Sequence, residues 1–150
     1  MDCVIGKARG RNQSVLVLTE RQTRFEIISK LPSKTAHSVV SALAQITTKY
    51  PYGTFQTITV DNGSEFASYE LLKTMTKEVY YCHPYTSCER GSNENANRLI
   101  RRYLPKGQSM ANVTQKQCDQ IAKTINRMHR KILNYQTAEE LFNAWQATLI

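Results

Sequence analysis

Apolar and polar residues alternate along the chain with two periods, and these periods predict its strands and helices. After a short apolar strand at residues 3–5, two runs rich in β-branched residues at 14–19 and 24–29 are joined by a connector short enough for an antiparallel hairpin. Beyond Pro32, apolar residues recur at helical spacing and predict an amphipathic helix, with a core-facing stripe of Ala36, Val39, Val40, Leu43 and Ile46.

The rest of the chain changes from alternating elements to helices. A strand, a helix and a strand are expected at residues 57–60, 69–75 and 79–82. A helix that begins near Glu94 and continues through Tyr103 follows, then another marked by Cys118, Ile121, Ala122, Ile125 and Met128. Thr137 to Glu140 has the pattern of a capping box for the last helix. This order predicts one α/β domain over residues 1–150, a five-stranded mixed sheet flanked by helices.

Three carboxylates lie at the ends of predicted elements. Asp2 opens the first strand, Asp61 follows the strand at 57–60, and Glu94 lies in the first turn of a helix. Carboxylates brought together from such positions suit hard divalent cations, which prefer oxygen ligands. The pattern is typical of a metal-dependent site for phosphoryl transfer.

Each acid also has a plainer interpretation. Asp61 can simply begin an Asp-Asn-Gly turn, because these residues favour turns on their own. Glu94 can serve only to complement the helix dipole, and Asp2 can be a frayed terminal residue. The three together favour a metal site more strongly than any one of them does.

The charge balance adds a polyanionic partner to this picture. The chain carries 20 Lys and Arg against 12 Asp and Glu, a formal net charge of +8, which favours salt-dependent binding to nucleic acid. Two basic groups stand out as candidate phosphate contacts, one after the first strand and one along the Glu94 helix: Lys7, Arg9, Arg11, and Arg98, Arg101, Arg102, Lys106. The alternative is that these residues only form a solvated surface.

Several segments, taken in order, resemble the catalytic core of DDE transposases, within the retroviral-integrase superfamily and most like the IS30 type. They are Asp2–Lys7, Asp61–Phe66, Pro84–Gly91, Asn93–Asn97, Tyr103–Gly107 and Arg130–Phe142. The resemblance implies a ribonuclease H-like fold. It also implies cleavage of transposon ends to a 3′-OH and joining of those ends to target DNA.

The resemblance further implies which residues form the site. Asp2, Asp61 and Glu94 would be the catalytic and metal-binding acids, holding two Mg²⁺ ions with Mn²⁺ as substitute. Glu89 is the rival for the third acid, but Gly91-x-x-Glu94-x-x-Asn97 matches the superfamily pattern and favours Glu94. Asn97 would join the basic residues at the DNA, and Glu65 would be a supporting group.

The expected partners and setting follow from the same likeness. DNA is the expected partner, as transposon ends and target, with a homodimer or higher oligomer in the strand-transfer complex. Without an apolar run of membrane-spanning length, we expect a cytoplasmic bacterial protein that is nucleoid-associated when acting. A helix-turn-helix region, which full-length transposases of this kind carry before the core, has no counterpart in the sequence.

Two other functions remain open. One is a ribonuclease H-like nuclease that cuts DNA without joining it. The other is a non-catalytic basic module that binds DNA without metal. The four cysteines form no Cys-x-x-Cys pairs, so neither a zinc ribbon nor a disulfide framework is expected.

Overall fold

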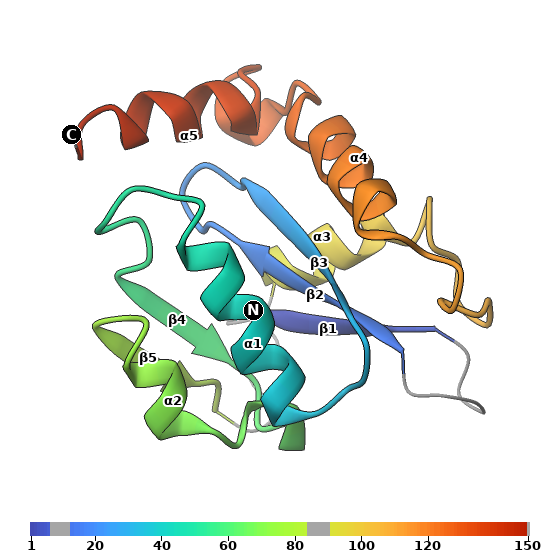
Figure 1. Ribbon diagram of the computed structural model, residues 1–150. Coiled ribbons are helices and arrows are strands. Elements are labelled where there is room, and N and C mark those ends of the chain that lie inside the picture. Colours follow the sequence, from blue (N-terminus) through green and yellow to red (C-terminus); the bar gives the residue numbers. More distant parts are fainter. Residues whose placement is uncertain (7–12, 84–90, 150) are drawn as a thin grey trace.

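The computed structural model describes residues 1–6, 13–83 and 91–149, and its strands and helices alternate along the chain (Figure 1). The described strands are β1 (Asp2–Ile5), β2 (Ser14–Thr19), β3 (Glu26–Leu31), β4 (Thr57–Val60) and β5 (Glu78–Tyr81). The described α-helices are α1 (Ala36–Thr47), α2 (Tyr69–Lys73), α3 (Gly91–Ile100), α4 (Gln115–Asn126) and α5 (Ala138–Gln146). Two 3₁₀ turns, η1 (Ser64–Phe66) and η3 (Lys131–Leu133), complete them.

The first three strands form an antiparallel sheet in which β2 is central. β2 is apolar on both faces because helices cover both faces of the sheet (Figure 1). Leu16 and Leu18 face the cluster built on α1, whereas Val15 and Val17 face the cluster built on α4. Alternation along β2 therefore divides the core into two layers.

The remaining strands, β4 and β5, pair in parallel as a separate two-stranded sheet. The five expected strands are thus present, but the single five-stranded sheet is not: the described strands form two sheets. The reason lies at the start of β1, where only the terminal amine of Met1 reaches β4, donating to the Thr59 carbonyl at 2.8 Å. One hydrogen bond does not make a ladder, so the sheets meet without merging.

Helix ends follow the capping residues. The Thr137 hydroxyl accepts from the Glu140 amide at 3.2 Å, and the Glu140 carboxylate accepts from the Thr137 amide at 2.9 Å, so the predicted capping box is confirmed. Thr114 and Gln117 form a second capping box at α4, which the sequence analysis did not identify.

Two predicted boundaries were wrong. β3 begins at Glu26 rather than near residue 24, because Arg24 adopts a left-handed conformation (φ 61°) and its amide donates to the Glu20 carbonyl in a turn. The Glu94 helix ends at Ile100 instead of continuing through Tyr103, since Pro105 disfavours helical geometry in the residue before it. None of the helices within the described ranges is long and apolar enough to cross a membrane.

Candidate active site

Asp2 and Asn97 are the first pair of the candidate site, and they join β1 to α3. The Asn97 side-chain amide donates to Asp2 Oδ2 at 2.6 Å, and the Cys3 amide donates to Asp2 Oδ1 at 2.8 Å. Both carboxylate oxygens therefore accept a hydrogen bond, and the side chain is held in one orientation. Asn97 Oδ1 is buried and has no hydrogen-bond partner among the described residues. An unsatisfied buried oxygen is costly, so this atom is available to a cation or a donor.

Asp61 follows β4 directly and lies in a turn formed by its own side chain. The Gly63 amide donates to Asp61 Oδ1 at 3.1 Å, and the Asn62 side chain donates to the Cys82 carbonyl, just beyond β5, at 3.1 Å. The turn interpretation of Asp-Asn-Gly is therefore correct as local structure. The same bonds fix the half-buried Asp61 carboxylate at the end of the parallel strand pair.

Glu65 lies beneath this turn in a buried ion pair. Its side chain is only 4% exposed, and Oε1 lies 2.8 Å from Lys34 Nζ. That hydrogen bond raises the pKa of the Lys34 ammonium. The expected supporting role of Glu65 thus has a specific partner. Sequence reasoning missed Lys34, since nothing in its own neighbourhood distinguishes it from a surface lysine.

Cys3 connects the two acids electrostatically. Burial raises the pKa of its thiol to about 12, and the negative charges of Glu65, Asp2 and Asp61 act in the same direction. A thiol influenced by all three carboxylates lies close to each of them, which places Asp2 and Asp61 in the same part of the molecule. Cys3, Cys82 and Cys118 are free thiols.

Glu94 lies in the first turn of α3, as predicted, and its side chain is exposed. Glu94 precedes Asn97 by three residues, so the two share a face of the helix. Within the ranges that the structure describes, however, no three His, Cys, Asp or Glu side chains lie close enough together to hold a metal ion. The structure therefore brings Asp2 to α3 and leaves Glu94 one turn away.

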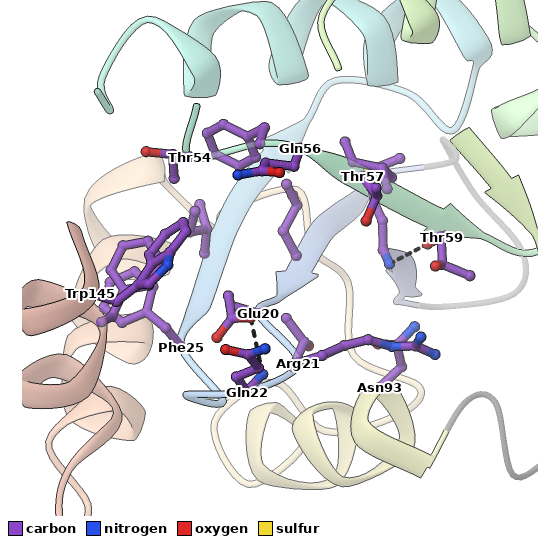
Figure 2. Close-up of a pocket in the computed structure, with 17 residues that line it drawn as sticks. Glu20, Arg21, Gln22, Phe25, Thr54, Gln56, Thr57, Thr59, Asn93 and Trp145 are labelled. Carbon is purple, nitrogen blue, oxygen red and sulfur yellow. Dashed lines mark hydrogen bonds between the residues drawn. The ribbon is translucent and has the colours of Figure 1, made fainter. Parts of the chain in front are cut away.

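The start of α3 is fixed by a residue that the sequence analysis missed. The Arg24 guanidinium donates to the Ser92 hydroxyl, which ties the β2–β3 turn to the first turn of α3. The left-handed backbone of Arg24 aims its side chain at this helix, and no sequence pattern identified it. Figure 2 shows Asn93, the next residue of α3, beside Arg21 from the same turn.

The predicted DNA-binding residues separate into three groups. Arg98, Arg102 and Lys106 are exposed, as a phosphate-binding surface requires. Arg101 instead donates to the Ile5 carbonyl at 2.7 Å and to the Leu104 carbonyl at 3.3 Å, and burial lowers the pKa of its guanidinium. The third group lies outside the described residues: Lys7, Arg9 and Arg11.

The donor set fits a hard divalent cation in its chemistry. Asp2, Asp61, Glu94 and the unsatisfied Asn97 oxygen are all oxygen donors, and no sulfur or imidazole ligand is required. A ligand set of this kind suits Mg²⁺ or Mn²⁺ better than zinc.

No model of a protein family matches the chain, but individual proteins do. It is 40% identical over 146 residues to a probable transposase of the insertion-like sequence element IS1161 of Streptococcus salivarius, covering 97% of this chain and 41% of that protein. It is 35% identical over 132 residues to transposase InsI of IS30A of Escherichia coli K12, covering 87% of this chain and 34% of that protein.

The fold has a counterpart among solved structures. The catalytic core domain of BIV integrase superposes with a TM-score of 0.70 at 19% identity, covering 97% of this chain and 95% of that one. This likeness implies a ribonuclease H-like α/β fold. Together with the sequence matches, it establishes that the chain is a homologue of insertion-sequence transposases, the IS30 type included, and spans about two fifths of the length of the curated relatives it matches.

Proposed function

We propose that the chain is the catalytic core of a DDE transposase, which performs divalent-metal-dependent phosphoryl transfer on DNA. The observation that carries the proposal is the 2.6 Å hydrogen bond from Asn97 to Asp2, in a chain homologous to transposases. This bond joins the acid on β1 to the helix that carries Glu94. An isolated surface acid would not need a half-buried amide to orient it.

In this proposal Asp2, Asp61 and Glu94 hold the metal ions. When bound, two divalent ions would stabilise the attacking and departing oxygens of the phosphodiester. Asn97 orients Asp2, and its unsatisfied oxygen faces the same region as the acid. The buried pair of Lys34 and Glu65 holds the turn that carries Asp61.

DNA would lie along the exposed side of α3 and the turn after it. Arg98, Arg102 and Lys106 supply positive charge there, and the formal net charge of +8 favours a polyanion over the rest of the surface. These contacts would position phosphates without reading base sequence. Transposon ends and target DNA are the proposed substrates, and a homodimer or higher oligomer is the proposed assembly in the strand-transfer complex.

The test is an assay on branched DNA that resembles a strand-transfer product, with Mg²⁺ or Mn²⁺. Wild type, Asp61→Asn and Glu94→Gln are compared with Glu70→Gln, which changes an exposed acid on α2. We expect metal-dependent breakage coupled to rejoining in wild type and Glu70→Gln, and loss of both in the other two variants. Mn²⁺ binding is followed by calorimetry on the same proteins.

Two other outcomes would contradict the proposal. Breakage without rejoining, dependent on the same acids, would indicate a ribonuclease H-like nuclease. The absence of a compact metal cluster among the described side chains favours a second candidate, a basic module that binds DNA without metal. DNA binding unchanged by Asp61→Asn, together with no Mn²⁺ binding, would establish that candidate instead.

A further inference from the structure

A cavity of about 400 Å³ lies where the two sheets meet. In Figure 2, Thr57 and Thr59 of β4 line one side, Glu20 and Gln22 of the β2–β3 turn lie opposite, and Trp145 closes one end. Its walls are strand edges and turns rather than a ring of convergent side chains. The cavity therefore has the shape of a gap in a sheet.

The amine of Met1 enters this gap in the position of a strand amide. It donates to the Thr59 carbonyl at 2.8 Å, as the amide of a strand residue parallel to β4 would, and the Met1 side chain is 7% exposed within the core. Burying a charged amine is costly, whereas a peptide N–H makes the same hydrogen bond without a charge. The site fits a peptide group better than a chain terminus.

The neighbouring strand has an unpaired stretch at the same place. β1 pairs with β2 from Ser14 to Val17, where Asp2 is the partner, but β2 continues to Thr19 in its pairing with β3. Extending the register places the residue before Met1 opposite Thr19. One extended segment would thus meet free edges of both β2 and β4.

We propose that this cavity is a strand slot, which takes an extended segment of about three residues joined to residue 1 and so merges the two sheets. The segment belongs to the same polypeptide in a longer form of the protein. The Streptococcus salivarius relative is matched over only 41% of its length, so chain for this role exists in the family. No separate partner is needed.

The chemistry of the segment follows from strand alternation. Met1 points into the α1 layer of the core, so the residue before it faces the opposite side, towards the polar Arg21 and Asn93. The residue before that faces the α1 layer again, where Ile27 and Phe55 line the cavity. The expected pattern is polar, apolar, polar.

The slot has a consequence for the acids. With the segment in place, Asp2 would lie inside a strand rather than at its start, and β1 would run beside β4, which leads into Asp61. The segment would fix the two acids relative to each other. That consequence rests on the proposed function, whereas the slot itself rests only on the cavity and the strand edges.

The experiment extends the chain upstream by Thr-Val-Thr, or by Gly-Pro-Gly as a control, each released from a cleavable tag. In a parallel ladder that continues from the Met1–Thr59 bond, the Thr59 amide donates to the second added residue counted back from Met1. We expect amide hydrogen exchange at Thr59 to slow about tenfold or more with Thr-Val-Thr and to stay unchanged with Gly-Pro-Gly. Equal exchange in both extended chains would overturn the proposal.

A second variant keeps the test independent of how the extensions fold. Acetylation of the Met1 amine removes its charge and retains an N–H for Thr59. If the slot is built for a peptide chain, acetylation raises the midpoint of thermal unfolding; a lower midpoint would show that the site needs the cationic amine. Trp145, the single tryptophan, reports on other occupants. Quenching of its fluorescence by a short single-stranded DNA, with Thr59 exchange unaffected by Thr-Val-Thr, would assign the cavity to nucleic acid instead.

Discussion

Asn97 donates a 2.6 Å hydrogen bond to Asp2 across 95 residues of sequence, and this contact positions the first acid of the site against the helix of the third. Its opposite amide oxygen has no partner within the described part of the chain. A residue first assigned to DNA contact therefore has a structural position next to the acids. Groups that orient a metal ligand in this way strongly influence the affinity for the metal.

Replacing Asn97 by alanine tests that role. Without the amide, Asp2 loses the donor to Oδ2, and we expect Mn²⁺ affinity to fall about 10–100-fold, measured by calorimetry. Asn95→Ala is the matched control, because Asn95 is exposed on the same helix and contacts only Arg98 by a described hydrogen bond. Equal Mn²⁺ affinity in the two variants would show that Asn97 does not act through Asp2.

Gly63→Ala should disturb two acids at once. A Cβ at this position would lie 2.6 Å from Glu65 Oε2 and 2.9 Å from Asp61 Oδ1. Glu65 cannot move freely, because it is buried in the ion pair with Lys34, so the turn must shift. We expect lower thermal stability together with weaker Mn²⁺ binding.

Gly91→Ala provides the comparison for that variant. A Cβ at Gly91 meets no heavy atom within 4 Å, and alanine favours a helix by about 0.5–1 kcal/mol over glycine. The thermal midpoint of Gly91→Ala should therefore equal or exceed that of the wild type. If Gly63→Ala behaves in the same way, the turn around Asp61 is not crowded as described.

The ion pair between Lys34 and Glu65 gives a third prediction. Lys34→Met leaves a carboxylate that is 4% exposed without its partner, while Lys34 itself is 29% exposed. Partial exposure moderates the penalty, and we expect a loss of about 1–3 kcal/mol in the free energy of unfolding. Denaturant titration of Lys34→Met, Glu65→Gln and the double variant measures the coupling.

The double variant decides the interpretation. Removing both partners leaves no buried charge, so Lys34→Met with Glu65→Gln should recover most of the stability that Lys34→Met alone removes. Additive destabilisation by the two substitutions would show that the residues do not depend on each other.

Sequence patterns predicted the local structure of this chain well because that structure depends on neighbours. The α1 stripe, the strand before Asp61 and the Thr137 capping box all involve residues within a few positions of one another. The helix that carries Glu94 was likewise found, although its end was placed too late. Such features follow from periodicity and capping rules.

What the sequence did not reveal depends on contacts between distant segments. Lys34 meets Glu65, and Arg24 meets Ser92, across 31 and 68 positions respectively. Division of the strands into two sheets depends on how far β1 reaches along β4, which no local pattern encodes. Arg101 matched a phosphate contact by charge and spacing, but its guanidinium is committed to the Ile5 carbonyl.

Glu26 makes stability depend on pH. Burial raises the pKa of this carboxyl to about 7 from an ordinary 4.5, partly offset by the Thr19 hydroxyl, which donates to it at 2.7 Å. The folded state therefore holds a proton that the unfolded state releases at lower pH. The free energy of unfolding should fall as pH rises from about 4.5 to about 7, by roughly 2–3 kcal/mol, and then level off.

Glu26→Gln should remove this contribution, since the amide keeps the shape of the protonated acid. We expect its free energy of unfolding to exceed that of the wild type at pH 8 and to match it near pH 4.5. Glu70→Gln, at an exposed acid, should keep the wild-type pH profile. An unchanged slope in Glu26→Gln would assign the pH dependence to other groups.

The exposed and committed arginines should separate in DNA binding. Arg102 and Lys106 are exposed, so replacing each by glutamine should weaken binding and reduce the slope of log affinity against log salt by about 0.9 for each phosphate that is no longer neutralised. Arg101→Gln should instead lower the thermal midpoint, because it removes the bond to the Ile5 carbonyl at the end of β1. Titrations of a fluorescent duplex at several salt concentrations, paired with thermal unfolding, distinguish the two effects. A salt slope reduced by Arg101→Gln with stability unchanged would mean that its side chain leaves Ile5 to bind phosphate, and the basic surface would then extend to the end of β1.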